Sequence, residues 1–248
     1  MPVKERLDKL LVDRGLAASR ERARALILAG QVVVGEHAVD KAGVKVDCDV
    51  PLRLKGEDLP FVSRGGVKLA HALEAFALEV AGRTAIDVGA STGGFTDCLL
   101  QRGAAKVFAV DVGYGQLAWK LREDSRVVSL ERTNIRQLTP DRLSAVPDLA
   151  VIDASFISLD KILPPTLALL PAGGEVVALI KPQFEVGRGQ VGKGGVVRDP
   201  GQHEAVVERV RMEAESLGCT VLGVTESPLL GQKGNREFLI HLRKGGVA

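Results

Sequence analysis

The segment Thr84–Phe95, with the sequence TAIDVGASTGGF, limits the possible folds more than any other part of the chain. Its first five residues have the composition of a buried strand, and Gly89, Gly93 and Gly94 then predict a sharp turn into a helix. Glycine tolerates positive φ and lets a ligand approach the backbone, while the first N–H groups of the helix stay available to that ligand. The segment therefore predicts an α/β fold with a ligand site at a strand end.

The spacing of these glycines favours one class of ligand. It reads G-x-x-x-G-G with Asp87 two residues before the first glycine, whereas dinucleotide-binding turns read G-x-G-x-x-G. This pattern resembles the S-adenosylmethionine loop of class I methyltransferases. Asp111 ends the next apolar segment about 20 residues later, where an acid binds ribose hydroxyls in nucleotide-binding folds. Taken alone, the loop is also compatible with an ordinary strand, turn and helix.

The second, larger part of the chain alternates strands and helices in the order of a doubly wound parallel sheet. Ligands of such sheets lie beyond the carboxyl ends of the strands. We predict two helices, at residues 67–76 and 201–217, with others between the strands. We predict strands at residues 84–88, 106–110, 126–130, 149–152, 175–180, 220–225 and 237–242.

The first 30 residues carry seven basic and four acidic side chains, and their leucines recur at helical spacing. A second helix is predicted to begin after Ser19, and a hairpin to follow Gly30. The strings RLDKLL, GLAASR and GQVVVG resemble the RNA-binding module named after ribosomal protein S-four, over about 50 residues. We therefore expect a small α/β RNA-binding domain at 1–58, a linker at 59–63 and the larger domain at 64–248. Candidate phosphate contacts in the small domain are Arg6, Arg20, Arg24 and Lys41.

Four charged residues are predicted at strand or helix ends above the glycine-rich loop: Lys68, Asp153, Lys181 and Glu237. Together they resemble the Lys-Asp-Lys-Glu tetrad of FtsJ-type ribose 2′-O-methyltransferases. A ribose hydroxyl is a weak acid, so its attack on a sulfonium methyl group needs a positioned base. Burial or a second ammonium group lowers the pKa of a lysine and enables it to act as that base. We assign Lys181 as the base and the other three residues as its setting.

Other methyl acceptors are disfavoured by residues that the chain lacks. Exocyclic amines are methylated beside a D/N-P-P-Y turn, but the chain reads DASF from Asp153 to Phe156. Methylation at cytosine carbon needs a cysteine near these strand ends, and Cys48, Cys98 and Cys219 lie elsewhere. A ribose hydroxyl, which distinguishes RNA from DNA, remains as the acceptor.

The whole chain resembles the TlyA, or hemolysin A, family of rRNA 2′-O-methyltransferases, through the motifs FVSRGGVK, VGASTGGF, DASF, KPQFE and GNRE. The resemblance implies S-adenosylmethionine as cofactor and cytidine riboses of ribosomal RNA, within ribosomal subunits, as substrate. The implied cofactor contacts are Asp87, Gly89, Ala90, Ser91, Thr92, Gly93, Gly94, Phe95, Asp111, Asn134 and Asp153.

Arginines in predicted loops on the cofactor side suggest a rim that binds RNA phosphates. We propose Arg64, Arg132, Arg136, Arg188, Arg198 and Arg236. Residues 182–200 carry five glycines and are expected to cover the target nucleotide as a lid, and Tyr114, Phe156 and Phe184 are candidates for base stacking.

Composition narrows the remaining classes. The net charge is only +2, and three scattered cysteines without a C-x-x-C pair predict neither a disulfide framework nor a metal site. No apolar run approaches the roughly 18 residues of a membrane span, and the first residues are charged, which favours a cytoplasmic protein over a membrane-active hemolysin. A catalytically silent ribosome-assembly factor remains an alternative, and the oligomeric state is open.

Overall fold

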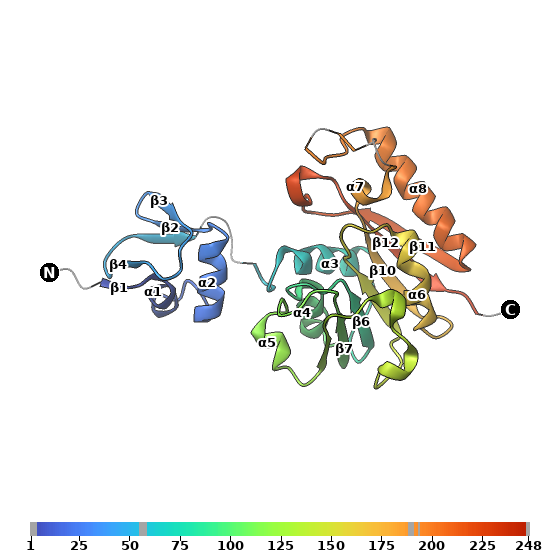
Figure 1. Ribbon diagram of the computed structural model, residues 1–248, viewed down its shortest axis with the longest axis horizontal. Coiled ribbons are helices and arrows are strands. Elements are labelled where there is room, and N and C mark those ends of the chain that lie inside the picture. The colour runs from blue at the N-terminus through green and yellow to red at the C-terminus, as the bar shows by residue number, and fades with distance from the viewer. Residues whose placement is uncertain (1–3, 55–58, 188–190, 193, 247–248) are drawn as a thin grey trace. The chain divides into compact units, whose positions relative to one another are not determined.

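The computed structural model describes residues 4–54, 59–187, 191–192 and 194–246. The chain forms two compact units, Met1–Leu59 and Pro60–Ala248 (Figure 1). Residues at the start of the second unit, within the expected linker, pack on its helix α4 (Gly94–Gln101): the Val62 N–H donates to Asp97 Oδ2 at 2.8 Å, and Phe61 is buried.

The first unit packs two helices against short strands. Leu7, Leu11, Leu26 and Ile27 are fully buried between them, which is the amphipathic pattern that the leucine spacing predicts. Ser19 caps the second helix by accepting the Arg22 N–H at 3.1 Å, as predicted. The strands pair antiparallel in the order β3-β2-β5, with β1 and β4 as a separate pair. The elements are β1 (Lys4–Arg6), α1 (Leu7–Asp13), α2 (Arg20–Leu28), β2 (Val32–Val34), β3 (His37–Val39), β4 (Lys45–Asp47) and β5 (Leu52–Leu54).

The second unit contains a seven-stranded sheet in the order β11-β12-β10-β9-β6-β7-β8. The central strands are parallel, and β12 runs antiparallel to both of its neighbours. All the predicted strands are present; four have the predicted bounds, and the ends of β8, β11 and β12 differ by one or two residues. They are β6 (Thr84–Val88), β7 (Lys106–Val110), β8 (Val127–Leu130), β9 (Leu149–Ile152), β10 (Glu175–Ile180), β11 (Cys219–Glu226) and β12 (Phe238–Lys244).

Helices cover both faces of this sheet (Figure 1). One core packs α3 and α4 against Val151, Val177 and Leu239, and the other packs α6 and α8 against Ile152, Val176 and their neighbours. Burial on both faces explains why the central strands are almost continuously apolar. The remaining elements are α3 (Arg64–Ala75), α5 (Trp119–Arg122), η1 (Ile135–Gln137), η2 (Pro140–Arg142), η3 (Leu159–Lys161), α6 (Leu163–Ala168), α7 (Pro182–Glu185), α8 (Pro200–Ser216) and η4 (Gln232–Gly234).

Helix α3 begins three residues earlier than predicted. The sequence Arg64-Gly-Gly discourages a helix assignment, because glycine is a poor helix former. Here packing decides: a Cβ on Gly66 would lie 2.3 Å from the Phe61 ring, so the close contact between this turn and Phe61 requires glycine. The correction matters for the site, since this first turn lies beside the strand ends.

Candidate active site

The glycine-rich loop has the geometry that the sequence predicts. Gly89 and Gly93 adopt φ of +86° and +94°, which favours glycine at both positions. A Cβ on Gly93 would also lie 2.2 Å from Leu121 Cδ1, so the loop packs closely on the segment that follows β7. Ser91 adopts φ +49° without being glycine, and backbone strain of this kind concentrates at ligand sites.

The loop has a buried side and an exposed side. Phe95 and Gly94 are buried beneath it, whereas Ser91 and Thr92 are exposed. Asp87, which we expected among the cofactor contacts, is fully buried, and its Oδ2 accepts the Thr96 N–H at 2.9 Å and Oγ1–H at 2.7 Å. Through Oδ2, Asp87 therefore supports the first turn of α4.

The second oxygen of Asp87, Oδ1, is buried and has no hydrogen-bond partner among the described residues. Burial, opposed by the hydrogen bonds from Thr96, raises the pKa of Asp87 to about 7. A buried carboxylate with an orphaned oxygen is costly unless a cation or donor comes close. This observation fits the positively charged methionine end of S-adenosylmethionine.

Asp111 follows β7 and lies beside the glycine-rich loop. Its carboxylate accepts the Ser91 N–H at 2.7 Å and the Gly113 N–H at 2.6 Å, so it joins the glycine-rich loop to the loop after β7. A narrow cleft beside it is lined by Ala90, Gln116, Leu117, Ser129 and Glu131, among others. Asn134 caps η1, because its Oδ1 accepts the Arg136 N–H at 3.0 Å. The cleft lies at the carboxyl ends of β6, β7 and β8, where sheets of this kind bind their ligands.

The four charged residues of the predicted tetrad form two ion pairs. Lys68 Nζ lies 2.5 Å from Glu237 Oε2, and Lys181 Nζ lies 2.6 Å from Asp153 Oδ1. Each lysine therefore has its own carboxylate, and the formal charge of the set is zero. Lys181 Nζ also contacts Ser155 Oγ at 2.9 Å.

Strand register brings the two pairs to one edge of the sheet. Ile180 of β10 pairs with Phe238 of β12, so Lys181 and Glu237 lie next to each other just beyond the paired residues. The Asp153 N–H donates to the Val88 carbonyl at 3.0 Å, which places Asp153 beside the glycine-rich loop. A Cβ on Gly65, in the first turn of α3, would lie 3.5 Å from Asp153 Oδ2, so the helix that carries Lys68 reaches the same place.

The two pairs differ in access to solvent. The side chains of Lys68 and Glu237 are 11% and 3% exposed, whereas Asp153 is 24% exposed beside Lys181 at 10%. The two lysines are therefore buried alike, and the pairs differ in their carboxylates, of which Asp153 is the more open to solvent.

The segment after Asp153 carries an exposed aromatic ring and is held by a buried glutamate. Phe156 is 87% exposed and adopts φ +65°, and its ring centroid lies 5.2 Å from that of Phe184. Buried Glu185 holds this segment, because it accepts the Ser158 Oγ–H at 2.6 Å and the Leu159 N–H at 2.8 Å. Glu185 and Ser155 were not predicted as site residues. Their place in the motifs KPQFE and DASF was the available signal.

The arginines of the expected rim have separate positions. Arg64 donates to the Leu230 carbonyl at 2.6 Å, Arg132 lies over the Tyr114 ring at 4.3 Å, and Arg236 pairs with Glu226 at 2.6 Å. Arg136 and Arg198 are exposed. Arg188 lies outside the described residues, as does part of the expected lid. Two residues in the described part of that segment are held by Asn235, which accepts the Val197 N–H and donates to the Gly195 carbonyl, each at 3.0 Å.

In the first unit, three of the four predicted phosphate contacts converge on one acid. Arg6, Arg20 and Arg24 all donate to Asp8, at distances of 3.0 to 3.1 Å. Asp8 is fully buried, and these hydrogen bonds, from Arg6 above all, hold the pKa of its carboxyl well below the usual range. Lys41 is exposed elsewhere in this unit.

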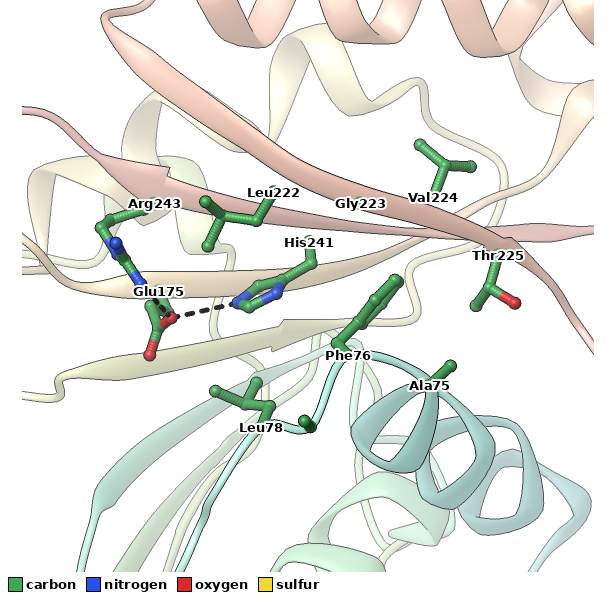
Figure 2. Close-up of a pocket in the computed structure, with 11 residues that line it drawn as sticks. Ala75, Phe76, Leu78, Glu175, Leu222, Gly223, Val224, Thr225, His241 and Arg243 are labelled. Carbon is green, nitrogen blue, oxygen red and sulfur yellow. Dashed lines mark hydrogen bonds and ion pairs between the residues drawn. The ribbon is translucent and has the colours of Figure 1, made fainter.

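A separate cavity of ≈ 520 Å³ lies toward the other end of β10. Figure 2 shows Phe76 and Leu78 on one side of it, and His241 directed at Glu175. The Glu175 carboxylate accepts hydrogen bonds from Arg83 at 2.7 Å and His241 at 3.2 Å. Glu175 and His241 in this cavity thus pair with each other and with Arg83, and Lys181 lies beyond the opposite end of β10.

Fold and site together define a class I methyltransferase. The chain belongs to the FtsJ-like methyltransferase family, which matches residues 61–244, and within it to the TlyA, or hemolysin A, family; an S4 domain matches residues 5–48. The cofactor of this fold is S-adenosylmethionine. Two carboxylates fit this cofactor: the unpaired oxygen of buried Asp87 suits its cationic end, and Asp111, which lines the cleft, suits its ribose hydroxyls.

Relatives match almost the whole chain. The 16S/23S rRNA (cytidine-2′-O)-methyltransferase TlyA of Mycobacterium tuberculosis is 51% identical over 98% of this chain and 91% of its own length. Hemolysin A of Brachyspira hyodysenteriae is 40% identical over 95% of this chain and 98% of its own length. A solved structure from Streptococcus thermophilus, provisionally named a hemolysin, is 51% identical, covers 99% of this chain and 90% of its own, and superposes with a TM-score of 0.77. Among the described residues, no helix has the length and apolar character of a membrane span.

Proposed function

We propose that this chain transfers a methyl group from S-adenosylmethionine to the ribose 2′-hydroxyl of cytidine in ribosomal RNA. The observation that carries the proposal is the pair of lysine–carboxylate contacts beside the glycine-rich loop. The activity of the Mycobacterium tuberculosis relative, which is 51% identical, supports cytidine of 16S and 23S rRNA as the substrate. On this proposal, residues 1–58 bind RNA, residues 64–248 catalyse, and 59–63 join them in a cytoplasmic protein that acts on ribosomal subunits.

Lys181 is the base in this proposal. When bound, S-adenosylmethionine supplies an electrophilic methyl group on a sulfonium. The Lys181 amine would take the 2′-hydroxyl proton as the ribose oxygen displaces the sulfonium sulfur from the methyl carbon, and Asp153, 2.6 Å from Lys181 Nζ, would hold the resulting ammonium. The two lysines are buried alike, but Asp153 is 24% exposed and Glu237 only 3%, which supports the Lys181–Asp153 pair as the one that meets the substrate.

Lys68 and Glu237 have a positioning role in this proposal. Their contact spans 169 positions of sequence and joins α3 to the start of β12. Because the pair is buried, it orients the first turn of α3 beside Asp153.

Phe156 is the proposed contact for the target base. An aromatic ring that is 87% exposed and held at positive φ is costly for a folded chain, and such strain is kept where function requires it. Its ring edge is supported by Phe184, and its loop begins at Asp153. A cytosine stacked on Phe156 would place its ribose near Lys181, while arginines around the strand ends contact flanking phosphates.

The experiment compares Lys181→Met with Lys161→Met. Lys161 is an exposed lysine paired with Asp160 at 3.2 Å, so its variant removes the same charge without touching the tetrad. K181M should abolish methyl transfer to unmodified ribosomal RNA and leave RNA binding within about twofold, whereas K161M should remain active. Normal transfer by K181M would refute the assigned base. RNA binding without any transfer by the unaltered protein would favour a catalytically silent assembly factor.

A further inference from the structure

The three arginines of the first unit share one buried partner. Asp8 Oδ2 accepts hydrogen bonds from Arg6, Arg20 and Arg24, and Oδ1 accepts a second one from Arg6. Arg20 and Arg24 lie one turn apart on α2, and Arg6 directly precedes α1. A single carboxylate thus draws guanidinium groups from two elements into one cluster.

The cluster is charged and open to solvent. The arginine side chains are 40%, 51% and 53% exposed, whereas Asp8 beneath them is 0% exposed. Three guanidinium groups around one carboxylate leave a formal charge of +2. Each guanidinium carries five N–H donors, and Asp8 engages at most two of them, so most donors face outward.

Such an arrangement suits a phosphate backbone. Long arginine side chains lose conformational freedom when they bind, and a fixed anchor removes part of that cost beforehand. Without Asp8, three like charges held this close would repel one another and spread apart. Asp8 therefore lowers the positive charge available to RNA by one, but it holds the three arginine side chains in a fixed arrangement.

We propose that Asp8 is a positioning residue for RNA binding, which holds Arg6, Arg20 and Arg24 as a preformed site for adjacent phosphates of single- or double-stranded RNA. The inference rests on the proposed function, because it presumes that the first unit binds ribosomal RNA. Its consequence is opposite to simple charge reasoning: removal of this acid weakens the binding of a polyanion.

The test compares Asp8→Asn with Asp13→Asn in the full chain. Asp13 lies on the same helix, is 51% exposed and contacts Lys9 at 3.6 Å, so both variants add the same charge, but only D8N touches the arginine cluster. Binding to protein-free 23S ribosomal RNA is measured over a range of salt concentrations. We expect D8N to bind about tenfold more weakly with a shallower salt dependence, and D13N to bind as tightly as the unaltered chain or up to about threefold tighter.

Two further variants separate positioning from loss of fold. Asp8→Glu keeps the charge but displaces the carboxylate by one methylene, and should weaken binding several-fold. In an Arg24→Gln background, D8N should reduce the affinity for RNA less than in the unaltered chain, because one of the arginines that Asp8 positions is absent. Equal binding by D8N and D13N, full affinity of D8E, or additive effects of D8N and R24Q would each overturn the inference. If the unaltered chain itself fails to bind rRNA, the proposed function fails instead.

Discussion

The buried pair Lys68–Glu237 gives the sharpest separation between stability and catalysis. Glu237→Gln removes the carboxylate and leaves the Lys68 ammonium in a place where its side chain is only 11% exposed. Loss of one partner of a buried pair typically costs about 3–5 kcal/mol, because the remaining charge stays buried without compensation. Replacement of both partners by apolar side chains of similar volume is often neutral or stabilising.

We therefore expect E237Q to lower the free energy of unfolding by about 3 kcal/mol, and the double variant K68M/E237M to recover most of that loss. Glu237 Oε1 lies where a Cβ of Gly231 would be, so the surrounding turn fits the glutamate closely and the recovery will be incomplete. Both variants should lose ribose methylation, since neither keeps the second ammonium–carboxylate pair.

Urea denaturation followed by circular dichroism measures the first quantity, and methyl transfer to unmodified rRNA the second. Lys9→Met provides the control, because Lys9 forms an exposed ion pair with Glu5 at 2.6 Å, and exposed pairs contribute little. The reasoning is refuted if the double variant is as unstable as E237Q, which would show that shape rather than charge governs this place. Retained methylation in the double variant would remove the pair from the catalytic proposal.

Three other outcomes follow from single contacts. Phe156→Gly relieves a positive φ but loses the contact with Phe184, so the free energy of unfolding should change by no more than about 1 kcal/mol. Methyl transfer should fall about tenfold or more, because the ring that stacks on the base is gone. Kinetic assays of F156G and F156A test this, and unchanged transfer by both would contradict it. Burial raises the pKa of Asp87 from 3.8 to about 7, so the folded chain binds this proton more tightly than the unfolded chain does. The free energy of unfolding therefore falls as pH rises from about 4 to 7. Denaturation at several pH values should show a weaker pH dependence for Asp87→Asn than for the unaltered chain. Burial alone would raise the pKa of Glu175, but Arg83 and neighbouring cations outweigh burial, so the pKa is lowered. The carboxylate therefore stabilises the fold above pH 4.5 and loses this contribution as pH falls further. Thermal melts at several pH values should show a smaller acid-induced loss of stability for Glu175→Gln, and an equal loss would count against this role.

The fold could be predicted closely because its strongest signals are local. Buried strands such as Leu149–Ile152 are continuous apolar runs bounded by polar or turn residues, and Ser19 supplies a cap that the structure contains. The strands β1 and β4 escaped prediction because each has three residues, mostly charged, and no alternation to detect. The start of α3 escaped because a tertiary contact with Phe61 overrides the low helix propensity of two glycines.

The sequence places the four tetrad residues near one another but does not reveal how they pair. Asp153, Lys181 and Glu237 adjoin strand ends, whereas Lys68 lies in the second turn of α3, and its contact with Glu237 depends on the placement of β12 beside β10. Charge reasoning treated Asp8 as one acid subtracted from a basic helix, whereas the structure places it at the centre of the arginine cluster. The role of Glu185 depends on contacts with residues 26 and 27 positions away, which no local pattern encodes.

Alkaline digestion tests the central claim most directly. The protein is incubated with methyl-labelled S-adenosylmethionine and unmodified ribosomal RNA, and the RNA is then hydrolysed by alkali, which needs a free 2′-hydroxyl at each cleaved linkage. We predict that the label is recovered in alkali-resistant dinucleotides that carry a methylated cytidine, and that K181M yields none. Label in ordinary mononucleotides would place the methyl group on a base and contradict the account.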